Sequence, residues 1–482
     1  MEIRTGVQFE TADSALQRLY DTACRKCEGN LTRFGGHTVL VEGGGYEKLW
    51  LETQPMGGEM YAKRNPEAAL GNVRCFLEAQ RADGRLPGSI QRMPDGALQA
   101  QFNKIQGFCF AEPALNLYYW LGRNRAYLDE LARCLEAFDR YLWACRDSDG
   151  DGLLESWCVY DTGEDNALRY GDAPNYWEGE TPPTGSAVVP MASMDFMGYS
   201  HGCRETLAKI SRIRRDGRCG FWQRQAREVR MRLRKGLWDG RKHACFDRDR
   251  CGNPLPVLTH NNLRCMYWGV FSQGMADRFV QRHLLNPREF WTPLPLPSVA
   301  ANDPAFRNAP ENNWSGQPEG LTYQRAIRAL ERYGYAHLVP ALGRKLLRAV
   351  IAGGYVFPQQ FDPFTAAPSR VGMISHRPLA PDSPEPFQDG YGPTLLAALE
   401  YIAHLWGVHM QEENLWFSLC RADAPYRYAQ QWGENDYRIE SDGKTAQLYV
   451  NGRQIAREAC GTRLITDAEG TVLGRVQLEK QA

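Results

Sequence analysis

The sequence has no excess of charge of either sign. Its 57 Lys and Arg residues equal its 57 Asp and Glu residues, so the formal net charge is zero. Proteins that bind the phosphate backbone of nucleic acids need a basic surplus. We therefore expect no nucleic-acid partner, and the composition leaves the oligomeric state open.

Long hydrophobic runs are also missing. No apolar stretch approaches the roughly 20 residues of a membrane-spanning helix. The first residues, MEIRTGVQFETADSAL, have neither the basic start nor the apolar centre of a signal peptide. We therefore expect no membrane partner and a cytoplasmic protein.

Spacings typical of metal sites are scarce. Cys24 and Cys27 form a CxxC, but no second pair follows at zinc spacing, and the nine histidines do not cluster along the chain. Residues 147–152 begin like a calcium-binding EF-hand loop, yet Cys158 stands where that loop needs a Glu. We expect reduced cysteines, a tight turn at 147–152, no metal and no cofactor.

Helical periodicity is what the sequence does have. In residues 126–145 the apolar side chains repeat every three or four positions, which predicts an amphipathic helix. Asn65 and Pro66 are typical of an N-cap and a first helical residue. Similar patterns occur near residues 12–26, 192–213, 222–237, 322–333, 337–352 and 394–406.

The connections between these helices are unequal in length. Short turns alternate with long loops rich in Gly, Pro and Trp, at 36–64, 147–190, 286–320 and 354–392. This alternation predicts a mostly α toroid over residues 1–410, with the loops building a pocket on one face. Short strands at 437–440, 446–450 and 472–476, separated by Gly turns, predict a small antiparallel β appendage over residues 411–482.

The second long loop carries the clearest motif. DSDGDGLLE at 147–155 is followed by DTGEDNALRY at 161–170. This segment resembles the acid-bearing loop of trehalases, processing α-glucosidases and mannosylglycerate hydrolases, which are six-hairpin glycosidases. The resemblance implies an (α/α)6 barrel, a general acid at Asp165, and a sugar or carboxylate contact at Arg169.

Two later segments extend the resemblance to roughly residues 40–405. FWTPLPLPS at 290–298, continuing to Asn302-Asp-Pro304, is similar to the FxTPxPxPSxxxxDP stretch of these families. Asn313-Trp-Ser-Gly316 and the helical pattern after it are similar to their YWRGP segment. The Arg of that segment is Ser315 here, so one sugar contact differs.

The second catalytic carboxylate is not where the resemblance implies. Glycosidic bonds are usually cleaved by two carboxyl groups, one acting as acid and one as base or nucleophile. The base of these families lies in an E-x-[YF]-D-P motif before the last helix. The segment FPQQFDP at 357–363 has Gln359 in that place, and a neutral amide cannot take a proton from water.

Four explanations of Gln359 stay open. The base could be another residue, with Glu385, Asp362 and Glu319 as candidates, or the chain could be an intentionally inactivated form. An inverting phosphorylase needs no base, because phosphate is already anionic, and a sugar-binding protein needs no catalysis. We expect an inverting hydrolase of a small α-linked glycoside, with Asp165, Gln359, Glu385 and Glu319 as the catalytic candidates.

Aromatic and polar side chains of the long loops are candidates for holding a small carbohydrate. The first loop departs from the WDxxF pattern of the resembling families, and Gln54 and Gln317 could instead brace their loops. The candidates are Trp50, Glu52, Gln54, Tyr61, Arg169, Trp177, Trp314, Gln317, Gln388 and Tyr391.

Overall fold

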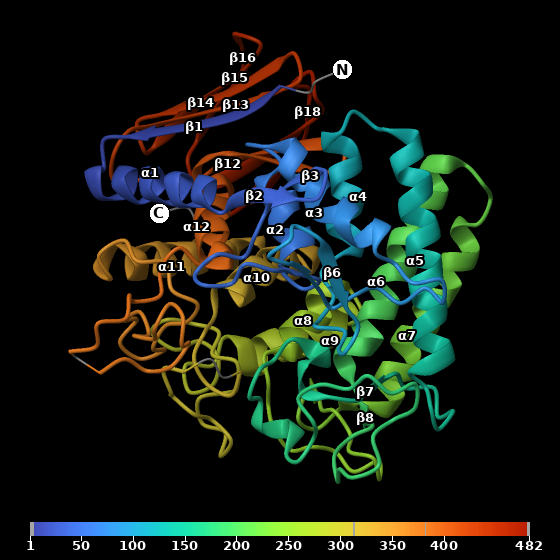
Figure 1. Cartoon of the computed structure of the whole chain (residues 1–482). Helices are drawn as coiled ribbons and strands as arrows, with labels where there is room; N and C mark the ends of the chain where they lie inside the picture. The colour runs from blue at the N-terminus through green and yellow to red at the C-terminus, as the bar shows by residue number, and fades with distance from the viewer. Residues whose placement is uncertain (1–3, 312–313, 381, 480–482) are drawn as a thin grey trace.

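The protein has a helical body with β-sheets stacked on one end (Figure 1). The structure, a computed structural model, describes residues 4–311, 314–380 and 382–479. The chain folds as mostly α structure, followed by antiparallel sheets. No helix among the described residues is both long and apolar enough to cross a bilayer.

Six helices in the described part of the chain contact one another in a closed ring, which we call the inner ring. Each contacts the next in chain order, and the last contacts the first. In α8 and α12 every residue is buried. The inner ring consists of α2 (Gln54–Tyr61), α4 (Ala111–Trp120), α6 (Met194–Arg214), α8 (Asn261–Trp268), α10 (Gly320–Arg332) and α12 (Gly392–Trp406).

The other helices alternate with the inner ring along the chain and pack outside it. Several have the amphipathic patterns that predicted them. In α5, the predicted stripe from Leu128 to Leu142 is buried, and Asn65 caps α3 by accepting a hydrogen bond from Ala68 N at 2.9 Å. The helices are α1 (Ser14–Gly29), α3 (Pro66–Glu78), α5 (Arg125–Cys145), α7 (Cys219–Gly236), α9 (Gln273–Phe279) and α11 (Val339–Ala352).

The long loops contain only short pieces of regular structure. Most lie at the end of the helical body away from the β-sheets (Figure 1). The strands between the helices are β2 (Leu31–Phe34), β3 (His37–Leu40), β4 (Leu49–Trp50), β5 (Ser89–Arg92), β6 (Leu98–Gln101), β7 (Glu155–Ser156), β8 (Met191–Ala192), β9 (Trp238–Asp239) and β10 (Ala244–Cys245). Short turns of 3₁₀ or π helix occupy Val159–Thr162, Leu168–Tyr170, Val280–Leu284 and Ala336–Leu338.

Two antiparallel sheets form the β appendage. One has the order β1-β13-β14-β15-β16 and the other β11-β12-β17-β18. The three predicted strands are confirmed as parts of β14, β15 and β18. The strands are β1 (Thr5–Thr11), β11 (Val408–Gln411), β12 (Asn414–Leu419), β13 (Tyr426–Trp432), β14 (Asn435–Ser441), β15 (Thr445–Val450), β16 (Arg453–Ala459), β17 (Thr462–Thr466) and β18 (Val472–Gln477).

The first strand of the chain belongs to this C-terminal part. β1 pairs with β13 over its full length, from Thr5 opposite Trp432 to Thr11 opposite Tyr426. The predicted division at residue 410 assigned this strand to the helical region, because β1 has no hairpin partner nearby in sequence. The sheets therefore join the two ends of the chain.

Candidate active site

The N-terminal ends of the inner-ring helices gather buried polar side chains. Glu52 lies just before α2, Glu319 immediately precedes α10, and Tyr391 immediately precedes α12. Asp195 and Asn261 lie in the first turns of α6 and α8 and are fully buried. Because the ring is closed, these helix ends converge on a single region, which the long loops cover.

The loop that carries Asp165 is tied to the loop that carries Trp314. The main-chain oxygen of Asp165 accepts a hydrogen bond from Trp314 N at 3.1 Å. Leu168 N donates to the hydroxyl of Ser315 at 2.8 Å. Two of the three segments that carry the family resemblance are thus in direct contact, and Ser315 braces the acid-bearing loop. Asn313 lies outside the described residues.

Arg169 is held by two buried carboxylates. Its guanidinium pairs with Glu164 and lies 3.1 Å from Asp247 Oδ2. Burial raises the pKa of Glu164, but Arg169 and Arg264 outweigh burial and hold that pKa well below its usual range. Arg169 is thus held between two carboxylates, and we leave it out of the proposed sugar contacts.

Glu319 and Gln359 are hydrogen-bonded to each other. Gln359 Nε2 donates to Glu319 Oε2 at 3.2 Å, and the Tyr46 hydroxyl donates to Gln359 Oε1 at 2.8 Å. Glu319 is fully buried, and its other oxygen, Oε1, has no hydrogen-bond partner among the described residues. The amide at the expected base position thus orients a carboxylate from another loop.

Four acidic residues, Glu42, Glu52, Asp165 and Glu319, form what we call the acidic cluster. Burial raises the pKa of Glu319 well above its usual range, and the charges of the other three members raise it further. Burial also raises the pKa of Glu42, whose Oε1 accepts a hydrogen bond from Tyr391 at 3.0 Å. Mutual repulsion in a buried site favours retention of protons by some of these groups.

Glu52 is the member of the acidic cluster that pairs with an arginine. Its Oε2 lies 2.8 Å from Arg325 Nη2 on α10, and Gln106 donates to Oε1 at 3.4 Å. Gly163 has a φ of 72°, and a Cβ there would lie 2.4 Å from the Glu52 carboxyl group. The acid-bearing loop therefore needs glycine at this position to pack against Glu52.

A basic and aromatic patch lies close to Asp165. Lys104 Nζ lies over the Trp50 ring at 5.5 Å and over the Tyr176 ring at 5.1 Å. Burial, assisted by Lys48, lowers the pKa of Lys104 to about 8, although the charge of Asp165 opposes this change. A cation beside the acid-bearing loop suits a substrate with an anionic group.

Three other predicted sugar-binding residues contact the acidic cluster or a residue that is hydrogen-bonded to it. Trp314 is buried, with its ring centroid 5.4 Å from that of His260. Gln388 accepts a hydrogen bond from Gln359 N at 3.2 Å and donates to Gly44 O at 3.1 Å. Tyr391, as described above, donates to Glu42. Gln388 and Tyr391 therefore support the site from the loop before α12.

Several other predicted site residues have different surroundings. Tyr61 lies at the C-terminal end of α2, away from the acidic cluster, where burial raises its pKa and the nearby Cys27 raises it further. The Trp177 indole donates to Thr181 O at 2.7 Å within its own exposed loop. Glu385 accepts hydrogen bonds from the main chain of Ile374 and Ser375, which makes it a loop cap.

Three polar candidates brace their loops. Gln54 Oε1 accepts hydrogen bonds from Trp50 N and the Thr53 hydroxyl, both at 2.5 Å. Gln317 accepts from Gln360 at 3.1 Å and from Ser369, while Asp362 accepts from Phe364 N and Thr365 N. We therefore leave Gln54, Gln317 and Asp362, with Tyr61, Trp177 and Glu385, out of the proposed site.

Sequence reasoning missed Glu42, Tyr46 and Lys104. Glu42 and Tyr46 flank the glycines of the stretch VEGGGY, where the Gly-rich turn could have indicated a close backbone approach. Lys104 has no motif around it, and only folding brings it to Trp50. At residues 147–152, Asp147, Asp149 and Asp151 each accept a main-chain hydrogen bond from within the turn, as expected of a tight turn.

The chain is similar to a known family of glycoside hydrolases. The profile of the mannosylglycerate hydrolase MGH1-like glycoside hydrolase domain matches residues 60–377, which is more than half of the chain. The chain belongs to this family. It is therefore a glycoside hydrolase of the six-hairpin group, as the sequence motifs implied. No curated protein matches the chain significantly.

Several solved structures share the fold of this chain at low sequence identity. Mannosylglycerate hydrolase from Thermus thermophilus, solved in complex with glucose, has a TM-score of 0.61 and 19% identity, covering 80% of this chain and 99% of its own. Neutral trehalase Nth1 from Saccharomyces cerevisiae has a TM-score of 0.57 and 13% identity, covering 77% and 74%. A structure described as a sialidase has a TM-score of 0.69 and 13% identity, covering 95% and 41%.

Proposed function

We propose that this glycoside hydrolase cleaves a small α-linked glycoside with inversion, on an (α/α)6 toroid formed by the inner ring and the helices around it. Asp165 is the general acid and gives its proton to the leaving oxygen. Glu319 is the general base and takes a proton from the water that attacks the anomeric carbon. Such a pair needs a separation of about 6.5–9.5 Å, which leaves room for the water.

The observation that carries this proposal is the state of the Glu319 carboxylate. One of its oxygens accepts the Gln359 amide, while the other has no hydrogen-bond partner among the described residues of a fully buried site. A general base needs such an uncommitted oxygen within reach of a water molecule. Asp362 and Glu385, the other two candidates, use their oxygens to cap loops.

Gln359 then becomes a positioning residue. Its Oε1 is fixed by Tyr46 and its main-chain nitrogen by Gln388, so its Nε2 is directed toward Glu319. In the resembling families a Glu at this place would itself be the base. Here the carboxylate comes from residue 319 instead, and the amide holds it.

The pH dependence follows from burial of the base. Burial raises the pKa of Glu319, and the negative charges of the acidic cluster raise it further. A base acts only when deprotonated, so the rate must increase as pH rises through this pKa. The raised pKa also makes the ionised Glu319 a stronger acceptor for the proton of water.

The leaving group is proposed to be acidic. A Thermus thermophilus mannosylglycerate hydrolase structure contains D-glycerate. In this chain, Lys104 lies over Trp50 and close enough to Asp165 for the two charges to interact. A carboxylate on the leaving group would pair with Lys104 while the glycosidic oxygen faces Asp165.

The test is sugar release from a panel of α-linked disaccharides and glycosides, including glycosides of glycerate. Asp165→Asn and Glu319→Gln should each reduce kcat by about 10²- to 10⁴-fold, because each removes a proton-transfer group. Glu385→Gln, a matched change in an exposed loop, should keep wild-type activity. Full activity of Glu319→Gln would remove Glu319 as the base.

Parallel assays with and without phosphate separate the alternatives. Hydrolysis independent of phosphate supports the proposal. Strict phosphate dependence with a sugar phosphate as product would indicate a phosphorylase. Binding of a sugar without turnover, even at high protein concentration, would indicate a sugar-binding protein.

A further inference from the structure

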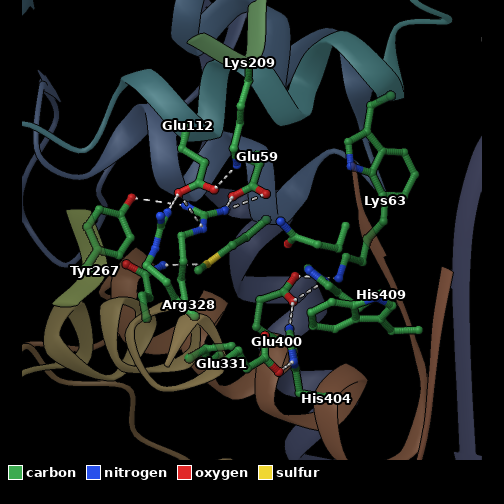
Figure 2. A pocket seen from close by; sticks show the side chains of 17 residues that line it. Glu59, Lys63, Glu112, Lys209, Tyr267, Arg328, Glu331, Glu400, His404 and His409 are labelled. Atoms are coloured by element: carbon green, nitrogen blue, oxygen red, sulfur yellow. Dashed lines mark hydrogen bonds and ion pairs between the residues drawn. The ribbon is translucent and has the colours of Figure 1, made fainter. Parts of the chain in front are cut away.

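A cavity lies at the end of the inner ring opposite the acidic cluster, where the ring helices α2, α10 and α12 have their C-terminal halves. Its volume is about 260 Å³. These helices contribute Glu59, Arg328 and Glu400, and the β appendage contributes His409 (Figure 2). Trp416 of the appendage also lines the cavity. This cavity belongs to neither the acidic cluster nor the loops that cover it.

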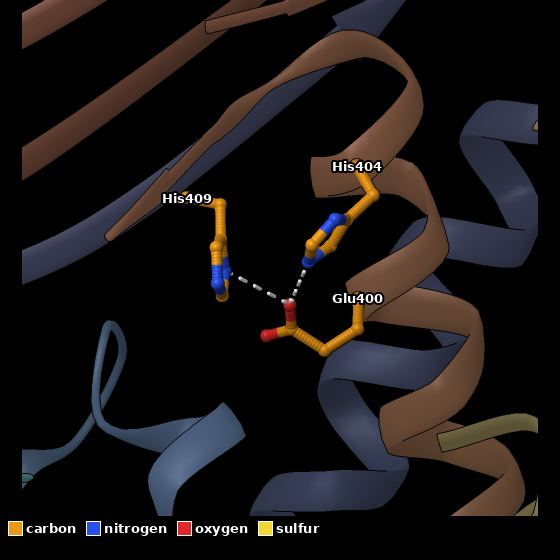
Figure 3. A group of neighbouring side chains, drawn as sticks. All are labelled: Glu400, His404 and His409. Atoms are coloured by element: carbon orange, nitrogen blue, oxygen red, sulfur yellow. Dashed lines mark ion pairs between the residues drawn. The ribbon is translucent and has the colours of Figure 1, made fainter. Parts of the chain in front are cut away.

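Three potential metal ligands meet at the wall of this cavity. Glu400 and His404 lie one helical turn apart on α12, and His409 follows on β11 (Figure 3). Their ligand atoms all lie within 4.8 Å of one another. Glu400 and His404 are 2% and 1% exposed, and the His409 side chain is 13% exposed. The spacing along the chain did not indicate this cluster, because His409 lies beyond the end of α12.

We propose that Glu400, His404 and His409 bind one divalent transition-metal ion of the zinc type, with its fourth coordination position facing the cavity. Two imidazoles and one carboxylate with an open fourth position are the ligand set of several zinc sites. The remaining position would take water or a small anion from the cavity.

The distances fit shared coordination better than hydrogen bonding. Glu400 Oε2 lies 3.6 Å from His404 Nε2 and 3.7 Å from His409 Nδ1. Hydrogen bonds between nitrogen and oxygen are shorter, about 2.7–3.2 Å. Tetrahedral ligands at the usual zinc distances of about 2.0–2.1 Å are roughly 3.3 Å apart. His409 Nδ1 and Glu400 Oε2 also have no hydrogen-bond partner among the described residues.

A second carboxylate orients His404. The Nδ1 atom of His404 lies 3.0 Å from Glu331 Oε1 and, at the longer distance of 3.3 Å, from Arg463 Nη2. Donation from Nδ1 to Glu331 leaves the lone pair of Nε2 facing Glu400. Metal-binding histidines are commonly oriented by a carboxylate in this way.

Lys63 pairs with one oxygen of Glu400 and leaves the other oxygen facing the two imidazoles. Its Nζ lies 2.6 Å from Oε1, while Oε2 is the oxygen that faces both imidazoles. The ion pair fixes the orientation of the carboxylate. The positive charge of Lys63 weakens cation binding, so a chelating set of three ligands is needed to overcome it.

The experiment measures metal uptake by the full chain. Wild-type protein is stripped with a chelator, dialysed against Zn²⁺ and analysed for metal per chain. We expect one tightly bound Zn²⁺ in the wild type and at least about 10- to 100-fold weaker binding in His409→Ala and Glu400→Gln. His337→Ala, at an exposed histidine, is the control and should bind like the wild type.

Cobalt substitution identifies the ligands. The fourteen cysteines could also bind zinc, but thiolate ligands give Co²⁺ intense charge-transfer absorption that nitrogen and oxygen ligands do not. We expect d–d bands of a four-coordinate site without thiolate bands. Three results would overturn the proposal: a wild type that takes up no stoichiometric Zn²⁺, thiolate bands in the Co²⁺ spectrum, or Zn²⁺ uptake that is unchanged in both variants. If His409→Ala does not fold, the isosteric Glu400→Gln decides.

Discussion

At the residue scale, the candidate site combines residues that local motifs predict with pairings that only the fold creates. The sequence predicted Asp165 and identified the amide at 359, because both lie in local motifs. The pairing of Gln359 with Glu319 joins residues 40 positions apart, so no local pattern indicates it. Glu319 was one of three candidate bases, and only its uncommitted, buried oxygen separates it from the others.

Lys104 provides a test of the leaving group. Its pKa of about 8 means that it is charged below that pH and neutral above it. For an anionic glycoside we expect KM to rise as pH increases through 8, while KM for an uncharged glycoside stays flat. Lys104→Met should raise KM for the anionic substrate about tenfold below pH 8 and remove the pH effect. An unchanged KM profile in the variant would exclude an ionic contact.

Glu319→Gln should also stabilise the protein. In the folded state burial raises the pKa of Glu319, whereas the unfolded chain has a value of about 4.3. The stability that this group contributes is complete below that unfolded value and is lost as pH rises through the folded pKa. Each unit of pKa shift amounts to about 1.4 kcal/mol.

The neutral Gln variant avoids this loss. Its free energy of unfolding, measured in urea, should therefore exceed that of the wild type by an amount that grows from pH 4 to pH 8. An equal difference at all pH values would show that the charge of Glu319 does not destabilise the folded state.

At the element scale, three of the four α-helices of the described residues that periodicity missed have no polar face; the fourth is the seven-residue α9. α5 and α11 have one apolar face and were predicted from their periodicity. α2, α4 and α8 are buried on nearly all sides, so their sequences lack that pattern. Sequence periodicity finds helices at the surface of this fold better than those of the inner ring.

A largely buried ion pair joins α2 and α10 of the inner ring. Arg328 on α10 contacts both oxygens of Glu59 on α2, at 3.0 and 2.9 Å. Arg328→Leu should lower the free energy of unfolding by about 3–5 kcal/mol, because it leaves Glu59 charged and unpaired in the ring. The double variant Glu59→Leu, Arg328→Leu should recover part of this loss. If the single and the double variant lose the same free energy of unfolding, the ion pair itself contributes little to stability.

At the scale of the whole molecule, the two ends of the helical ring have different coverings. Long loops cover the helix N-termini, and the β appendage covers the C-termini (Figure 1). The sequence predicted both regions but not their relation, because β1 reaches its partner β13 across more than 400 residues. Long-range pairing of this kind leaves no sequence signal.

Removal of β1 tests how far the appendage depends on the N-terminus. Deletion of residues 1–12 should lower Tm and cause concentration-dependent association, because β13 becomes an unprotected edge. Leu473→Ser, on the exposed side of β18, is the control and should leave Tm close to the wild type. A monomeric deletion variant with unchanged Tm would show that the sheet is stable without its first strand.

The activity of Gln359→Glu beside that of the wild type, on the best substrate of the panel, decides whether Glu319 is the base. If Glu319 is the base, the variant loses the amide that orients it and gains a repelling charge, so kcat should fall by about tenfold or more. The swapped variant Glu319→Gln, Gln359→Glu should then have a higher kcat than Glu319→Gln alone. A wild type without activity and an active Gln359→Glu would instead show that the base belongs at position 359, and would contradict the role of Glu319.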